Sequence, residues 1–478
     1  MKTLFKRIFT LSVFLLNSFL FAEKTPFDNL FQEKLENGLE VFVLENHTVP
    51  LVYVEIAVKC GAFTQEKETA GLFHLYEHLM FKGNSKYKSA QEVNKALNDL
   101  GTASWNGTTG LECVNYYFTI PKDQLKEGLE FWSSAIRNPL LDKKELESEK
   151  KVVLSEIQRD FTEPASILSK KISETLYPAS PWKMSPGGSL DSVKNAGVKQ
   201  LKKIQKEFYI PGNSALFIGG DINPEEVFSL VKSVFSDWKK APSPFEKNGK
   251  STVVRHEKNP LSKPEYFVMP FDKMSKSLFQ VIVKFRGPDA QFELEDTYPL
   301  DMVFQVAENP QSYFKKFFTE EINLSIPEKD YIDAWYSTYR TCGSSTVQAM
   351  MDCSSGEIPF RVKKFTENIY GALEKSVLLM SDEDFKLIKQ RLKDDMIFNT
   401  ETPASFLSIL RQNWIFSSAE YFYTYNSKMD EVTKEEMLSS IEKYIKNLNP
   451  CVTVLINPEV FDECKTEFRE QGFSVIEK

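Results

Sequence analysis

The segment His74-Leu75-Tyr76-Glu77-His78 carries the residue types of a hydrolytic metal site. On a helix, residues four positions apart lie on one face, so the imidazoles of His74 and His78 can bind one zinc ion. Glu77 lies on the same side, where it can act as general base toward a water on the metal. This order, His-x-x-Glu-His, is the reverse of the commoner zinc-protease helix motif. The segment therefore predicts a zinc-dependent hydrolase.

Histidine is rare in this chain, which makes the pairing informative. The four histidines are His47, His74, His78 and His256. We interpret His47 and His256, which are isolated in the sequence, as ordinary surface or loop residues. An alternative for the pair is a hydrogen-bonded structural role, but two histidines and a glutamate buried without a metal would be costly.

A catalytic zinc ion needs a third protein ligand and an open position for water. The expected helix over residues 145–161 offers Glu149 and Glu156, which are two helical turns apart and point the same way. The apolar run Val152–Leu154 predicts that this helix is partly buried. From the pattern alone, either glutamate could equally be solvated on the surface.

Several segments of the first 240 residues resemble the pitrilysin/insulinase family of inverse-zincin metallopeptidases, which includes the mitochondrial processing peptidases. The matching segments are Leu35-Glu-Asn-Gly-Leu39, Gly71–Gly83 around the histidine pair, Glu149–Glu156, Phe208-Tyr-Ile-Pro-Gly-Asn213 and Gly219-Gly-Asp221. The resemblance implies that Glu156 is the third zinc ligand and that Glu149 supports the site from behind. It also implies that Asn106 lies on an edge strand that pairs with an extended substrate. The alternative for Asn106 is a simple turn residue.

The second half departs from the family pattern. It has no histidine after His256, in keeping with an inactive companion domain. Active family members commonly bring an arginine and a tyrosine, seven residues apart, from that domain to the substrate. The best alignment places Thr319 and Ile326 there, and neither can do that work. Arg340 and the tyrosines near it are the candidates to replace them. A second hypothesis follows, in which this chain is the metal-bearing member of a pair.

The hydrophobic periodicity predicts an α+β fold of two similar α/β-sandwich domains arranged as a pseudo-duplication. A proline-rich stretch over residues 241–264 predicts a linker between a catalytic domain, 23–240, and a companion domain, 265–478. Expected strands are 51–58, 101–106, 114–120, 213–219, 278–285, 345–351 and 452–456, with 35–44 as a hairpin or strand entry. Expected helices include 68–82, 123–137, 143–161, 189–209, 223–238 and one from Ser381 to Phe398.

The N-terminus has the layout of a secretory signal peptide over residues 1–22. Lys2, Lys6 and Arg7 precede an apolar run that ends near Ala22. We therefore expect an exported protein, periplasmic or secreted, with no stable membrane insertion after cleavage. The formal net charge of −8 becomes more negative without this segment, which disfavours nucleic acid as a partner. The six cysteines lack Cys-x-x-Cys spacing, and we expect mostly free, buried thiols.

Together these features predict a zinc endopeptidase, with one Zn²⁺ per chain, that cleaves peptides or unfolded protein segments. Under the pair hypothesis the chain forms a homodimer or a heterodimer with a related chain. The sequence also leaves open a non-catalytic scaffold subunit and a binding module that presents strands without cleaving them. Serine and cysteine peptidases have little support, because the chain has no Gly-x-Ser-x-Gly motif.

Overall fold

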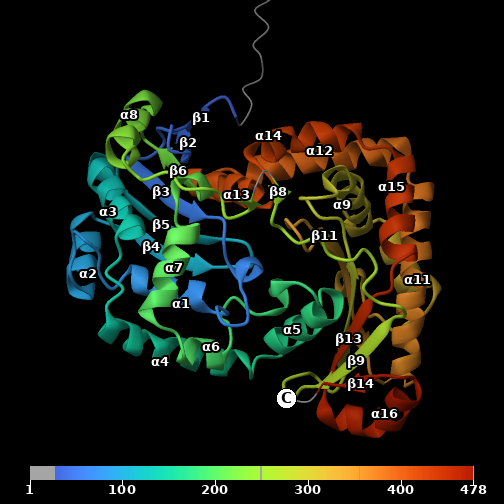
Figure 1. Ribbon diagram of the computed structural model, residues 1–478. Helices are drawn as coiled ribbons and strands as arrows, with labels where there is room; N and C mark the ends of the chain where they lie inside the picture. The colour runs from blue at the N-terminus through green and yellow to red at the C-terminus, as the bar shows by residue number, and fades with distance from the viewer. Residues whose placement is uncertain (1–26, 248–249, 355, 477–478) are drawn as a thin grey trace, which may run out of the picture.

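The computed structural model describes residues 27–247, 250–354 and 356–476, and within them two six-stranded sheets form the framework (Figure 1). The first sheet runs, in spatial order, through β1 (Leu30–Lys34), β2 (Glu40–Glu45), β6 (Ser214–Gly220), β3 (Leu51–Val58), β5 (Val114–Pro121) and β4 (Ser104–Thr109). The second runs through β14 (Ser474–Val475), β9 (Glu265–Pro270), β13 (Cys451–Ile456), β10 (Leu278–Arg286), β12 (Ser344–Asp352) and β11 (Ile332–Ser337).

The two sheets share one topology over five of their strands. In the first, β2 and β6 are parallel, and the pairs β6–β3, β3–β5 and β5–β4 are antiparallel. In the second, β9 and β13 are parallel, and β13–β10, β10–β12 and β12–β11 are antiparallel. The expected α+β pseudo-duplication is therefore confirmed, and each half has an edge strand, β4 or β11, in the same place.

Helices flank both sheets. In the first half they are α1 (Leu72–Met80), α2 (Ala90–Asp99), α3 (Leu125–Arg137), α4 (Lys143–Asp160), α5 (Pro164–Leu176), α6 (Leu190–Lys194), α7 (Val198–Phe208) and α8 (Pro224–Phe235). In the second half they are α9 (Leu294–Glu308), α10 (Tyr313–Lys316), α11 (Ile358–Leu379), α12 (Asp382–Asn399), α13 (Pro403–Phe416), α14 (Ala419–Glu431), α15 (Lys434–Ile441) and α16 (Pro458–Glu470).

Most expected elements are present, with three differences. The single helix expected over 189–209 is two helices, because the chain leaves the helical path at Asn195 and restarts after Gly197, whose backbone is extended. The strand expected over 101–106 is shifted to Ser104–Thr109. In the region 241–264, expected as a linker, the described residues include two short antiparallel strands, β7 (Glu246–Lys247) and β8 (Lys250–Ser251), and are otherwise irregular. The expected signal peptide, 1–22, lies outside the described residues.

Each half lends one helix to the other half's sheet (Figure 1). The green helix α5 packs against β13 and β10, where Leu168 meets Met269 and Leu455. The orange helix α13 packs against β6 and β3, where Trp414 stands edge-on to Phe217 with ring centroids 5.8 Å apart. The two halves are therefore joined through their cores.

The two exchanged helices begin with almost the same sequence. Pro164-Ala-Ser-Ile-Leu168 starts α5 and Pro403-Ala-Ser-Phe-Leu407 starts α13, each with proline in the first turn. Proline suits this position because its missing N–H has no partner within the helix. The repeat shows that the duplication extends to these helices, and it is visible in the sequence.

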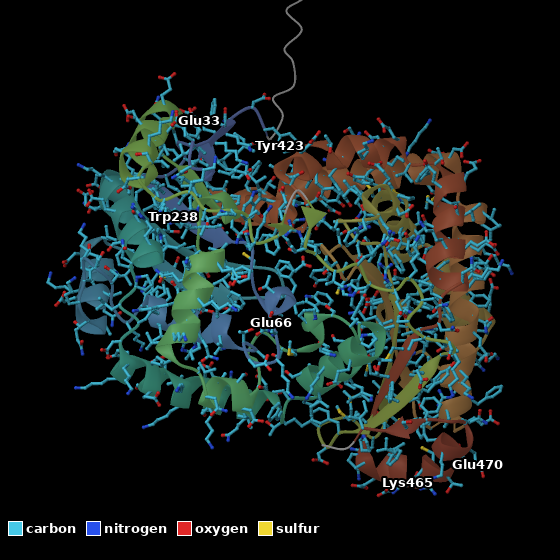
Figure 2. All side chains as sticks on the ribbon, in the orientation of Figure 1. Glu33, Glu66, Trp238, Tyr423, Lys465 and Glu470 are labelled. Carbon is cyan, nitrogen blue, oxygen red and sulfur yellow. The ribbon has the colours of Figure 1, made fainter. Side chains whose placement is uncertain are left out.

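The contact made by α13 includes a buried ion pair. Glu55 on β3 has no exposed surface, and Arg411 Nε lies 2.7 Å from its Oε1. Tyr53 and Asn115 donate hydrogen bonds to the same carboxylate, at 2.8 and 2.6 Å. Farther along, α14 reaches the first strand: the hydroxyl of Tyr423, which is labelled in Figure 2, donates a hydrogen bond to Gln32 Oε1 at 3.2 Å.

The six cysteines are free thiols, as expected, and all but the half-buried Cys353 are buried. None of the described helices combines the length and apolar composition needed to cross a bilayer.

Replacing Arg411 with methionine should lower the free energy of unfolding by about 3–5 kcal/mol, because the buried Glu55 carboxylate would lose its cation. Urea denaturation of Arg411→Met against wild type measures the effect. Arg391→Met is the matched control, since Arg391 is exposed and lies 3.8 Å from Asp395. Equal stability of the two variants would show that the pair does not hold the halves together.

Candidate metal centre

Helix α1 is buried on most sides, and this leaves one face for chemistry. Its apolar residues Leu72, Phe73, Leu75, Tyr76, Leu79 and Met80 are all buried. The helix starts at Gly71, whose φ of 84° favours glycine and where a Cβ would lie 2.4 Å from Gly187 O. His74, Glu77 and His78 occupy the remaining, partly exposed face. Leu75 and Tyr76 therefore point into the core.

Helix α4 brings Glu156 to the histidine pair. The Nε2 atoms of His74 and His78 are 3.2 Å apart, and each lies 3.6 Å from Glu156 Oε2. A tetrahedral zinc ion with Zn–N distances of about 2.0–2.1 Å places its ligand atoms about 3.3 Å apart. Among the described residues this is the one cluster of three such donors. The donor set fits zinc and leaves a fourth position without a protein ligand.

Glu149 stands behind His78 and is only 5% exposed. Its Oε2 lies 3.0 Å from His78 Nδ1, while its Oε1 forms an ion pair with Lys82 Nζ at 2.8 Å. A proton held on Nδ1 by this carboxylate leaves the Nε2 lone pair free to face the metal. Sequence reasoning missed Lys82, although its place four residues after His78 puts it on the same helical face.

Glu77 is held at its Oε2 atom by the edge strand β4. The Thr109 hydroxyl donates to Glu77 Oε2 at 2.7 Å. Burial raises the pKa of the Glu77 carboxyl, against the lowering effects of Thr109 and of His78. A Cβ on Gly107 would lie 3.0 Å from Glu77 Cγ, so glycine allows the strand to approach the helix. A raised pKa makes Glu77 a better proton acceptor.

The imidazole of His74 is suited to metal binding. Burial, with a smaller contribution from His78, lowers the pKa of His74 to about 4. The ring is therefore neutral at physiological pH, which is the form that binds a metal.

Asn106 lies within strand β4, so the interpretation as a turn residue is wrong. The side chain is exposed, and β4 is the last strand of its sheet among the described residues. Next to it, Trp105 is 40% exposed and packs against Phe81 with ring centroids 4.9 Å apart. The strand thus presents an open edge beside the three donors.

The other two histidines differ from each other. His47 is on the surface as expected, between Asp221 and Glu45. His256 lies in a loop, as one of the two expected alternatives has it, but its side chain is buried and not on the surface. Its Nε2 lies 3.4 Å from the Cys342 sulfur, in the junction between the halves.

Thr319, Ile326 and Arg340, the positions considered for the substrate-binding arginine and tyrosine, make structural contacts within the protein. Thr319 donates to the backbone of Lys315, and Ile326 is buried in the second core. Arg340 is 9% exposed, and its guanidinium lies over the rings of Phe63 and Phe245. Its backbone N–H donates to Glu112. Arg340 therefore joins the two halves.

Comparison with known protein families agrees with this geometry. Residues 41–185 match the model of the insulinase family (peptidase family M16), and residues 195–392 match the M16 inactive domain. The chain belongs to the M16, or insulinase, family, which confirms the resemblance seen in the sequence.

Curated relatives include two bacterial proteins named as zinc proteases. Zinc protease PqqE of Helicobacter pylori is 30% identical over 235 residues, which are 47% of this chain and 52% of that protein. The probable zinc protease PqqL of Haemophilus influenzae is 29% identical over 220 residues, 44% of this chain and 24% of that protein. The match thus spans about half of the first relative and about a quarter of the second.

Solved structures share the fold. A protease from Helicobacter pylori superposes with a TM-score of 0.72 at 19% identity, covering 89% of this chain and 99% of that one. The first half of the periplasmic protease PqqL from Escherichia coli gives 0.70 at 17% identity, covering 94% and 99%.

Glu149→Gln should weaken zinc binding about 10- to 100-fold, because the amide holds the His78 ring less firmly and leaves Lys82 without its partner. Competition with a chromogenic chelator measures the affinity. Glu147→Gln, two residues earlier and 57% exposed, is the matched control and should bind zinc as wild type does. Unchanged affinity in Glu149→Gln would contradict the supporting role.

Proposed function

We propose that this chain is a zinc-dependent endopeptidase acting on peptides or unfolded protein segments. His74, His78 and Glu156 hold the metal, Glu77 is the general base and Glu149 orients His78. The observation that carries the proposal is the convergence of three donor atoms within 3.6 Å of one another, with Glu77 on the same helical face. The relatives named as zinc proteases support it.

In the proposed reaction, each side chain of the site has its own role in peptide hydrolysis. Zinc, when bound, acts as a Lewis acid that polarises the scissile carbonyl and acidifies water. Glu77 accepts the proton of the attacking water and then gives it to the leaving amine. Thr109 fixes the Glu77 carboxylate through its 2.7 Å hydrogen bond. Both transfers use the same carboxylate, so its position beside the donors matters for both.

Strand β4 is the proposed substrate platform. An extended peptide that adds to its open edge would bind through main-chain hydrogen bonds, independently of most side chains. Asn106, exposed on that strand, would hold the peptide backbone. This mode requires an extended chain, so unfolded segments are favoured over folded proteins.

The remaining features of the proposal concern organisation and location. We place the catalytic domain at residues 23–240, the companion domain at 265–478 and the linker between them. We also propose that the protein is exported to the periplasm or secreted, as the N-terminal sequence indicates. A structural neighbour described as a periplasmic protease supports this location.

Glu77→Gln should retain zinc and lose peptide cleavage, because the amide cannot accept the proton while the three ligands remain. Metal analysis and cleavage of a quenched peptide library, with wild type and a chelator-treated sample beside it, measure both properties. Cleavage by Glu77→Gln at the wild-type rate would contradict the assignment of the base. Absence of zinc from both proteins would contradict the metal site.

A second candidate is a metal-bearing subunit that needs a partner chain, as a homodimer or a heterodimer. The positions of Thr319, Ile326 and Arg340 favour it, because none presents an arginine or tyrosine to a substrate. A scaffold without activity is less favoured, because every proposed ligand and the base are present.

For the partner-dependent form, the purified chain should bind zinc yet cleave the peptide library slowly. Addition of the related chain that copurifies with it should raise the rate by about tenfold or more, the scale expected for completing a catalytic site. Light scattering would give the stoichiometry. A normal rate from the isolated chain would remove the reason to invoke a partner.

A further inference from the structure

The duplication assigns the second half a counterpart of the metal site. We align Ala57 of β3 with Lys284 of β10, because each lies near the end of its strand and pairs with a residue near the start of the equivalent strand β6 or β13, Ala215 or Cys451. The same shift in residue number that aligns Ala57 with Lys284 aligns His74 with Asp301. It also aligns His78 with Gln305.

The burial pattern supports this alignment of α1 with α9. Asp301 and Gln305 are the partly exposed residues of a helix that is otherwise buried over 299–307, as His74 and His78 are on α1. Phe304, fully in the core, stands where α1 has Glu77. The second half therefore lacks the base and both imidazoles, but keeps polar side chains at the ligand positions.

Helix α12 supplies the counterpart of the third ligand. The two exchanged helices start at Pro164 and Pro403. The shift in residue number that aligns these two prolines also aligns Glu156 on α4 with Asp395 on α12. Helix α12 contacts α9 as α4 contacts α1. The carboxylate position is thus retained, although the glutamate has become an aspartate.

A cavity of about 510 Å³ opens between these elements and is lined by Asp301, Gln305 and Asp395. Helices α13 and α14 close its sides, and the end of β11 forms another wall. Its floor is buried, with Tyr336, Tyr421 and Phe422, while Asp395 at the rim is 53% exposed. This volume is of ligand size and far larger than one ion or water needs.

The cavity is acidic and has no cation of its own. Asp301 and Asp395 both line it, and no lysine, arginine or histidine is among its described lining residues. The Tyr425 hydroxyl donates to Asp301. Asp395 has only a long contact to Arg391, 3.8 Å and exposed, which contributes little. Burial raises the pKa of Asp301 to about 6, the sign of a carboxylate that a cation would stabilise.

Aromatic rings surround these carboxylates. Tyr421 and Tyr425 lie 5.8 Å apart, and Tyr339 stands against Phe416 with centroids 5.4 Å apart. All four line the cavity. Ring faces attract organic cations, and carboxylates supply the countercharge.

We propose that this cavity binds an organic cation, a guanidinium or alkylammonium group, between Asp301 and Asp395. The group belongs either to a free small molecule or to a basic side chain of a peptide. The inference does not rest on the peptidase activity, because none of the metal-site residues takes part.

Isothermal titration of the purified chain with agmatine, N-acetyl-arginine amide and N-acetyl-citrulline amide tests the proposal. Citrulline is the neutral isostere of arginine. We expect the two cations to bind and the citrulline compound to bind at least about tenfold more weakly, since charge-assisted hydrogen bonds are lost. Tighter binding of N-acetyl-arginine amide would identify a peptide side chain as the natural ligand, and tighter binding of agmatine a free cation.

Asp395→Asn should weaken binding of both cations about tenfold or more. Its matched control is Asp394→Asn, the adjacent acid on α12, whose Oδ1 accepts from Gln390 and which does not line the cavity. Asp301→Asn should have the same effect as Asp395→Asn, with its melting temperature measured to confirm folding. Equal binding of the citrulline and arginine compounds, no binding at millimolar concentration, or equal loss in Asp394→Asn and Asp395→Asn would each overturn the proposal.

Discussion

The proposed metal centre depends on the way helix α1 is buried. Three donor atoms must converge to within 3.6 Å although they come from two helices, and side-chain freedom would normally oppose this. Six buried apolar residues fix the rotation of α1, and the glycine contact at its start fixes its position. With α1 fixed, only one face remains for His74, Glu77 and His78. The geometry of the site is therefore a consequence of core packing.

A buried charge network then sets the chemistry of that face. Lys82 compensates Glu149, Glu149 fixes the tautomer of His78, and Thr109 holds Glu77 from the neighbouring strand. Each of these contacts satisfies a polar group that would otherwise be costly to bury. Because the network reaches from α4 to β4, the proposed substrate platform and the proposed metal ligands are positioned together.

The exchange of α5 and α13 makes the core of each half depend on the other half. Each sheet needs a second covering layer, and each obtains part of it from the other half. The companion half is thus necessary for the catalytic half's core, whatever becomes of its own ligand positions.

The sequence by itself predicted the paired architecture, most elements and the histidine pair and base of the proposed site. His74, Glu77 and His78 could be predicted because a helical repeat of four is a local property. The role of Glu156 required the family resemblance, since a solvated glutamate has the same pattern. The Pro-Ala-Ser repeat at residues 164 and 403 is visible in the sequence, but its meaning depends on where the two helices pack. Only the tertiary structure decided the Glu55–Arg411 pair, the burial of His256, the placing of Arg340 between the halves and the cavity lined by Asp301, Gln305 and Asp395. Each of these depends on contacts between residues far apart in the chain, and neither periodicity nor spacing reports such contacts.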